Sequence, residues 1–288
     1  MATPFGNFIT AGVQSSLGSF SNTADIALGN TSGNQPSSDS EGHHVLYDED
    51  VNVYYTPDAA TLTSYGIDAT SVTFSTSFPE DYSPADGDVY YYGDYMYSYN
   101  QVANFNADGS YWWDEYTAQD AYGSTYPWDT DGWGVRVVDR TKSSYGVIAD
   151  TLFGAPVDNL CGTFAMCTNL VDASAIVIPD SVNYLAYTFS YCSSLTSIPS
   201  ISASLWNQSY RAFLDCTSLT SVTVPVGTTS ISNDALKWCT NLESITFTGT
   251  TAEWNAIRKM SGWNSNTGIY TVTCTDGTVA KDGTVTLN

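Results

Sequence analysis

The sequence predicts a mainly β protein with short helices, in which an N-terminal antiparallel β domain is followed by a short solenoid of stacked repeats and a C-terminal cap. Two observations lead to this prediction. One pattern recurs four times between residues 163 and 242, and the residues before it alternate apolar and polar side chains over short runs. We expect a small-residue arm at 1–44, an acidic, aromatic-rich β domain at 45–150, repeats at 151–250 and the cap at 251–288.

Each copy of the repeat carries a large apolar residue, a cysteine three positions later and a leucine three positions after that. The cysteines are 25, 24 and 23 residues apart, a period typical of a solenoid. Residues three apart share one face of a helical turn, so the apolar residue and the cysteine should face the core together. Stacked copies make a continuous core that one copy cannot make alone. The predicted repeat core consists of Phe164, Cys167, Leu170, Phe189, Cys192, Leu195, Phe213, Cys216, Leu219, Leu236, Cys239 and Leu242.

A β-rich run follows each leucine. The runs predicted to be strands are 175–179, 195–199, 219–225 and 242–247, and the first three end at proline. Proline cannot donate a hydrogen bond to a neighbouring strand, so it should end each strand at an edge or a turn.

The residues Ala-Phe-x-x-Cys-Thr-Ser-Leu-Thr-Ser-Val-x-Val-Pro at 212–225 resemble the BspA-like class of leucine-rich repeats. The segments 247–250, 252–257 and 271–278 resemble the end that such arrays often have. The resemblance covers about residues 150–288. It implies a curved leucine-rich-repeat solenoid used for adhesion or recognition at surfaces, without catalysis.

The N-terminal half reads as a compact antiparallel sandwich or barrel. The runs 51–55 and 71–75 alternate as half-buried strands do. Residues 89–99, with Gly93 and Asp94 in the middle, predict a tight hairpin of tyrosine-rich strands. The runs 133–138 and 145–148 flank a polar turn and predict a second hairpin, and no stretch has helical periodicity.

The negative charge is concentrated in the same half. The net charge is −22, and residues 1–135 contain 19 Asp or Glu and no Lys or Arg. Nucleic acid is excluded as a partner, because binding it needs Lys and Arg to neutralise phosphates. Anionic membranes would also be repelled. The charge suits a well-solvated surface, and cation binding or a basic partner are the alternatives.

The sequence shows neither a secretory signal nor an apolar run long enough to span a membrane. Surface arrays of this class usually lie outside cells, so either a signal has been removed or the protein leaves its host without one. A bacteriophage virion protein does the latter, because it assembles in the cytoplasm and escapes by lysis. The arm, with apolar Phe5, Phe8 and Ile9 among small residues, could order against a neighbouring subunit.

The sequence offers few groups for catalysis or metal binding. His43 and His44 are the only histidines, so no catalytic triad is suggested, and no zinc pattern is present. The segment 129–132 resembles the start of a calcium loop, but Trp133 and Arg140 occupy later ligand positions. We therefore expect no metal site, no cofactor and no enzymatic activity.

Two further groups of side chains have structural and functional readings. The repeat cysteines should form a buried ladder of free thiols, because small apolar thiols fill tight core positions, while Cys161 and Cys274 lie outside that register. A cluster of aromatic residues could stack on a glycan or pack in the core. Its candidate binding residues are Trp112, Trp113, Trp128 and Trp133.

Three functions are consistent with these observations. The leading one is a non-enzymatic bacteriophage virion surface protein: a fibre, decoration or receptor-binding component. Its N-terminal half would attach to the particle, and its solenoid would be displayed for adhesion to the host. The alternatives are a bacterial cell-surface adhesin and a carbohydrate-active enzyme. Expected partners are other virion or surface proteins, a host-surface glycan or protein, and further copies of the chain.

Overall fold

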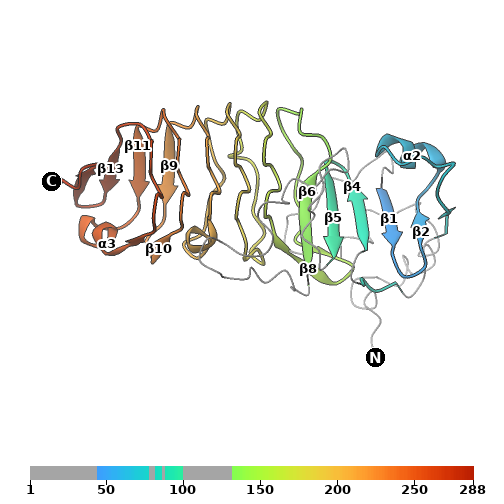
Figure 1. The fold of residues 1–288 in the computed structure, drawn as a ribbon. Coiled ribbons are helices and arrows are strands. Elements are labelled where there is room, and N and C mark those ends of the chain that lie inside the picture. The colour runs from blue at the N-terminus through green and yellow to red at the C-terminus, as the bar shows by residue number, and fades with distance from the viewer. Residues whose placement is uncertain (1–43, 78–81, 86–87, 100–131) are drawn as a thin grey trace. The chain divides into compact units, whose positions relative to one another are not determined.

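The computed structural model describes residues 44–77, 82–85, 88–99 and 132–288 (Figure 1). The chain divides into two compact units, each considered by itself below. Unit 1 comprises Met1–Asp139, Gly146–Asn159 and Pro179–Ser181. Unit 2 comprises Arg140–Tyr145, Leu160–Ile178 and Val182–Asn288. The prediction of a mainly β fold with short helices is confirmed, since the described residues contain many short strands and two six-residue α-helices.

Unit 1 is built on one sheet with the strand order β3-β2-β1-β4-β5-β6-β8-β7. Its neighbours are antiparallel except for the parallel pairs β2/β3 and β6/β8. The strands are β1 (His44–Asp48), β2 (Val53–Tyr55), β3 (Phe74–Ser75), β4 (Val89–Tyr92), β5 (Tyr95–Tyr99), β6 (Trp133–Val137), β7 (Thr151–Leu152) and β8 (Ala155–Asn159). The described part of unit 1 is thus a single sheet, and the expected sandwich or barrel is not formed.

The tyrosine-rich hairpin is confirmed. Strands β4 and β5 pair through Tyr92 and Tyr95, which leaves Gly93 and Asp94 as a two-residue turn. Gly93 has a φ of 56°, a left-handed conformation that a residue without a Cβ adopts readily. Tyr90 and Tyr97 are almost wholly buried, so the aromatic content of this region supplies the core of the sheet.

The predicted second hairpin is wrong, because residues 145–148 form no strand and β6 pairs instead with β5 and β8. In this segment, side chains form hydrogen bonds with backbone groups that a neighbouring strand would otherwise pair with. The Asp94 carboxylate accepts from the Gly146 amide at 2.7 Å, and the Tyr95 hydroxyl donates to the Gly146 carbonyl at 2.7 Å. The Tyr97 hydroxyl accepts from the Ala149 amide at 3.2 Å.

A short helix, α2 (Ala59–Ser64), occurs where the sequence indicated no helical periodicity. Its start is set by Asp58, whose carboxylate accepts from the Thr61 amide at 2.8 Å as an N-cap. The capping residue was a usable sequence signal, but six residues are too few for an apolar period to be visible.

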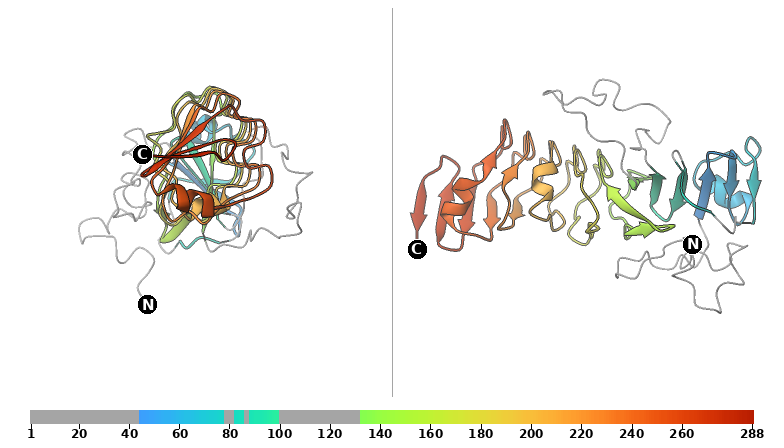
Figure 2. Two further views of the ribbon diagram at one scale, coloured as in Figure 1. Left: turned by 90° about the vertical axis from the view of Figure 1, so that its left-hand side faces the viewer. Right: turned by 90° about the horizontal axis from the view of Figure 1, so that it is seen from below.

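Unit 2 is a stack of coils that lie side by side in sequence order (Figure 2). We call the coils containing Cys167, Cys192, Cys216 and Cys239 coils 1 to 4. The strands β9 (Ser221–Val224), β11 (Ser244–Phe247) and β13 (Thr271–Cys274) form a parallel ladder, and β14 (Gly277–Ala280) and β15 (Val285–Leu287) extend it antiparallel. Further elements are η3 (Leu205–Gln208), the parallel pair β10 (Ser230–Ile231) and β12 (Arg258–Lys259), and helix α3 (Thr251–Ala256).

The strands predicted at 175–179 and 195–199 are not formed. In coils 1 and 2 the ladder is reduced to one isolated parallel bridge between Asp172 and Ser197. The strand position of coil 1 therefore comes directly after Leu170, as it does in coils 3 and 4 after their leucines. The run at 175–179 has three β-branched residues in succession, whereas Val-Asp-Ala-Ser at 171–174 has only one, which explains the misplacement.

The segment from the apolar residue to the cysteine is also not a helical turn. Its amides alternate between bonds within the coil and bonds to the next coil. In coil 1 the amides of Ala165 and Cys167 bond to carbonyls three residues back, while those of Phe164 and Met166 bond to the carbonyls of Thr188 and Ser190. The coils are thereby held in register, and the rings of Phe164 and Phe189 stack at 5.0 Å with planes 6° apart.

A fifth coil, which the sequence pattern did not reveal, follows α3. The Trp238 amide donates to the Ser265 carbonyl, in the way that earlier coils bond to their successors. In this coil, Asn264, Thr267 and Tyr270 occupy the positions of the phenylalanine, the cysteine and the leucine. Because all three characteristic residues are replaced and α3 lengthens the repeat, residue spacing alone could not identify this coil.

The cysteines of coils 2 to 4 form a ladder of buried thiols. The Sγ atoms of Cys192, Cys216 and Cys239 donate to the carbonyls of Phe164, Phe189 and Phe213 at 3.1, 3.1 and 3.2 Å. Burial raises the pKa of all three thiols, that of Cys239 to about 12. All six cysteines are free; Cys161 is half-buried and Cys274 is buried.

Replacing Phe213 by alanine should lower the free energy of unfolding by about 3–5 kcal/mol, because its ring is wholly buried and stacks on Phe189 at 5.6 Å. Urea unfolding followed by circular dichroism measures the loss. Thr246→Ala, at an exposed strand position of the same array, is the control and should change the free energy by less than about 0.5 kcal/mol. Equal stability of the Phe213→Ala variant and the parent would contradict the stacked core.

Iodoacetamide at pH 8 should label Cys161 first and leave Cys192, Cys216 and Cys239 unmodified until the protein is denatured. Only thiolates react, and the raised pKa values keep the ladder thiols protonated as well as inaccessible. Mass spectrometry of native and denatured samples measures the difference. Rapid native labelling of Cys216, or disulfides between ladder cysteines, would be inconsistent with this arrangement.

Candidate functional site

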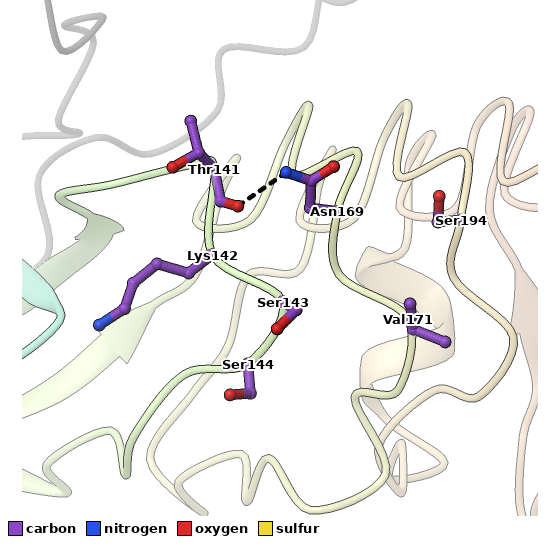
Figure 3. A pocket seen from close by; sticks show the side chains of 7 residues that line it. All are labelled: Thr141, Lys142, Ser143, Ser144, Asn169, Val171 and Ser194. Atoms are coloured by element: carbon purple, nitrogen blue, oxygen red, sulfur yellow. Dashed lines mark hydrogen bonds between the residues drawn. The ribbon is translucent and has the colours of Figure 1, made fainter.

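The candidate site is a groove of about 640 Å³ in unit 2, at the start of the repeat array (Figure 3). One side is formed by residues 140–145, which we call the strap, and the other by coils 1 and 2. The lining residues are Thr141, Lys142, Ser143, Ser144, Asn169, Val171 and Ser194. The groove is therefore predominantly lined by small polar side chains.

Contacts at both ends hold the strap against coil 1. At one end, Arg140 Nε donates to the Ala165 carbonyl and Asn169 Nδ2 to the Thr141 carbonyl, both at 2.8 Å. At the other end, the Tyr145 ring packs against Phe164 at 5.3 Å, and its hydroxyl donates to Cys167 Sγ at 3.2 Å. Tyr145 thus covers the core of the first coil, as the phenylalanines do between later coils.

The strap occupies the place of a preceding coil. The bond from Asn169 to the Thr141 carbonyl is equivalent to the bond from Asn241 to the Thr217 carbonyl, which joins coils 3 and 4 at 2.8 Å. In coil 3 the core residue Leu219 comes two positions after Thr217. Two positions after Thr141 stands Ser143, which is exposed. At the position where the coils have a buried leucine, the strap thus has an exposed serine that lines the groove.

An edge of the coil ladder lies next to the lining residue Val171. The Val171 carbonyl accepts from the Thr196 amide at 2.8 Å, and the Ala173 amide donates to the Ser197 carbonyl at 3.0 Å. These bonds point toward coil 2, so the alternating backbone directs the peptide groups of Asp172 toward the strap. Among the described residues, no backbone hydrogen bond joins Ser143 or Ser144 to 171–173. Backbone groups that make no backbone hydrogen bond to Ser143 or Ser144 in the described part of the chain therefore follow directly after the lining residue Val171.

The polar atoms of the lining are available to a ligand. Within the part of the chain that the structure describes, the hydroxyls of Ser143, Ser144 and Ser194 make no hydrogen bond, and neither does Asn169 Oδ1. Val171, with 48% of its surface exposed, adds an apolar area. Figure 3 shows the Lys142 side chain directed away from Asn169, Val171 and Ser194. The lining residues include no carboxylate, imidazole or thiol, so the groove is suited to binding and not to acid–base or nucleophilic chemistry.

A second polar surface lies on the strand ladder of the later coils. Thr246 is paired with Thr223 on β9 and with Thr273 on β13, and all three side chains are exposed. The alternate residues Val222, Ile245 and Val272 are buried, so the hydroxyl row faces outward and the apolar row forms the core. We call Thr223, Thr246 and Thr273 the threonine row.

The predicted glycan-stacking role of Trp133 is wrong. Its side chain has no exposed surface, and its indole Nε1 donates to the Leu152 carbonyl at 3.1 Å. The side chain lies at an inward position of strand β6, where its ring forms part of the core. Core packing was the alternative interpretation of the aromatic cluster. Trp112, Trp113 and Trp128 lie outside the described residues, and so does the calcium-like segment 129–131.

The residues assigned to the repeat core are all wholly buried. They are Phe164, Cys167, Leu170, Phe189, Cys192, Leu195, Phe213, Cys216, Leu219, Leu236, Cys239 and Leu242. Sequence reasoning missed the groove residues, because they come from the strap and from two coils. Over the described ranges, no cluster of three or more His, Cys, Asp or Glu could hold a metal ion. In the same ranges no helix combines the length and apolar character needed to cross a membrane.

Comparison with known proteins identifies the type of the coils. Residues 161–268 match the family described as BspA type Leucine rich repeat region, in six copies. This region is a BspA-type leucine-rich repeat array. A solved leucine-rich repeat protein of T. pallidum matches with a TM-score of 0.37 and 22% sequence identity. The match covers 48% of this chain and 61% of that one, so the chain spans less than two thirds of its length. No curated protein matches the chain.

Asn169→Ala should free one end of the strap, because it removes the bond to the Thr141 carbonyl. We expect faster amide hydrogen exchange at 141–144 and a loss of about 0.5–1.5 kcal/mol in unfolding free energy. Asn241→Ala removes the equivalent bond between coils 3 and 4 and should leave exchange in the strap unchanged. Equal strap exchange in both variants would show that Asn169 does not hold the strap.

Proposed function

We propose that this protein is a non-enzymatic recognition protein whose BspA-type repeat array binds a partner at a host surface. The observation that carries the proposal is the pair of outward-facing polar surfaces on the array, the groove and the threonine row. Both present hydroxyl groups above a rigid, stacked core, and an array of this kind keeps its binding surface in place through its neighbours. A glycan or a protein could be the partner.

The proposed location is the surface of a bacteriophage virion, with the protein serving as a fibre, decoration or receptor-binding component. The sequence supports this through an N-terminal arm in which the apolar residues Phe5, Phe8 and Ile9 stand among small residues, a composition suited to ordering against a neighbouring subunit. In this proposal the N-terminal half attaches to the particle, together with other virion proteins and further copies of the chain, and the repeats are displayed.

A bacterial cell-surface adhesin is the second candidate. The match of 161–268 to BspA-type repeats favours it, because it supports a role in surface adhesion without requiring a particle. A carbohydrate-active enzyme is less well supported, since glycosidases use two carboxylates about 5–10 Å apart and neither proposed binding surface contains one.

Binding of the purified full chain to host cells should fall at least tenfold when Thr246 is replaced by arginine. The substitution places a long charged side chain in the centre of the threonine row without entering the core. Cell-bound protein measured by flow cytometry gives the effect. Thr240→Arg, at an exposed position in the turn of coil 4, is the control and should bind like the parent.

Equal binding by the Thr246→Arg variant and the parent would remove the threonine row from the proposal, and absence of binding by the parent would contradict recognition altogether. Antibodies against the full chain separate the two locations. Immunogold label on purified particles supports the virion protein, whereas label confined to the envelope of the producing cells supports the adhesin.

A further inference from the structure

We propose that the groove between the strap and coils 1 and 2 is a binding site for an uncharged saccharide. This inference rests on the proposed function and deepens it, since it names the class of ligand and the place on the array where the ligand binds. It concerns a different surface from the threonine row, so the two can be tested separately.

The first argument is the type of polar atom that the groove presents. Three serine hydroxyls and one amide oxygen lack hydrogen-bond partners among the described residues; they belong to Ser143, Ser144, Ser194 and Asn169. A hydroxyl is both donor and acceptor and can rotate to suit its partner. Sugar hydroxyls have the same property. A ring carrying several hydroxyls can therefore satisfy these atoms together, which a ligand with only donors or only acceptors cannot do.

The second argument is shape. The groove is open and shallow, and its volume of about 640 Å³ has the size usual for small-molecule sites, about 300–1,000 Å³. The exposed side chain of Val171 supplies an apolar surface between the polar groups, and the C–H face of a sugar ring is apolar in the same way.

The third argument is charge, which distinguishes neutral from acidic sugars. Lys142 is the one charged residue of the lining, and its ammonium group is directed away from the other lining residues. Asp172, which follows the lining residue Val171, accepts from the Ser174 amide at 2.8 Å, an interaction that favours the ionised carboxylate. A net charge of −22 on the whole chain adds further repulsion. An uncharged saccharide avoids all of these unfavourable interactions.

An extended peptide fits the groove less well. Adding a strand requires a row of backbone groups, but residues 171–174 of coil 1 form no regular strand, and their single bridge position, at Asp172, pairs with coil 2. Peptide recognition also uses pockets for alternate side chains, and Val171 is the one large apolar residue in the lining. A peptide is therefore an outcome that the experiment must distinguish, and not the proposal.

The test titrates the full chain with chitotetraose, maltotetraose and xylotetraose as neutral probes, with tetragalacturonate as the anionic probe and an alternating Thr-Val octapeptide as the peptide probe. Isothermal titration calorimetry measures affinity. Hydrogen exchange of the strap amides locates the bound ligand. We expect at least one neutral saccharide to bind with protection at 141–144, and the anionic probe to bind at least tenfold more weakly.

Two matched variants locate the site. Ser194→Gln fills the groove from coil 2 and should weaken binding at least tenfold, whereas Ser218→Gln makes the same change at the equivalent position of coil 3 and should change it less than twofold. Both serines are half-buried, so thermal unfolding checks that the two variants remain folded. If Ser194→Gln does not fold, Ser144→Gln, at an exposed strap position, replaces it and should show the same loss.

Equal affinity of the groove variant and the Ser218→Gln control would overturn the inference. So would preferential binding of tetragalacturonate or of the octapeptide, or no binding of any neutral probe. These results are distinguishable from failure of the proposed function. If the parent chain still coats host cells but binds no neutral saccharide in the groove, recognition stands and the saccharide site falls. If it does not coat cells, the proposed function itself fails.

Discussion

The structure of unit 2 depends on the alternation of amide hydrogen bonds around the segment from the phenylalanine position to the cysteine of each coil. Three amides around this segment in each of coils 1 to 4 donate to the next coil, and the amides between them close short turns within their own coil. The bond from Phe164 to the Thr188 carbonyl, and its equivalent from Phe189 to the Ala212 carbonyl, set the spacing of the stacked rings. Side-chain packing and backbone bonding thus specify the same register, so neither can shift without loss of the other.

This arrangement requires left-handed backbone at two positions of each coil. The residue before the cysteine has a φ of 63° at Met166, 60° at Tyr191, 59° at Asp215 and 63° at Trp238. Such a conformation costs about 1–2 kcal/mol for a residue with a Cβ, and no glycine relieves it at these four places. The hydrogen bonds to the next coil and the buried phenylalanine and cysteine beside these residues must offset that cost.

The sequence predicted the structure correctly at positions where only one or two residue types can satisfy the local packing or turn geometry. The phenylalanine, cysteine and leucine positions recur because a stacked core admits little else, and the Gly93–Asp94 turn was recognisable from its local chemistry. Periodicity failed where polar residues carry the backbone bonds. It misplaced the strand of coil 1 and overlooked the fifth coil, in which Asn264, Thr267 and Tyr270 replace the characteristic residues.

The candidate groove could not be predicted, because the strap takes the place of a coil without carrying the residues that identify a coil in the sequence. Residues 141–145 carry neither the phenylalanine nor the leucine of the repeat, so nothing in their sequence relates them to a coil. The bond from Asn169 to Thr141 reveals the relation. Trp133 shows the opposite limit, since aromatic composition left glycan stacking and core packing both open and the position on the sheet decided for burial.

The reversal of strand direction after β13 has a consequence for solubility. A parallel solenoid that ended at β13 would present a full row of unpaired backbone groups, in the same orientation as every junction between its coils. Such an edge is a template on which another chain could continue the stack. Strands β14 and β15 run antiparallel to their neighbours, and β15 is only three residues long. An incoming chain would meet a short edge of changed hydrogen-bonding pattern at β15, which is less suited than a parallel edge to continuing the stack.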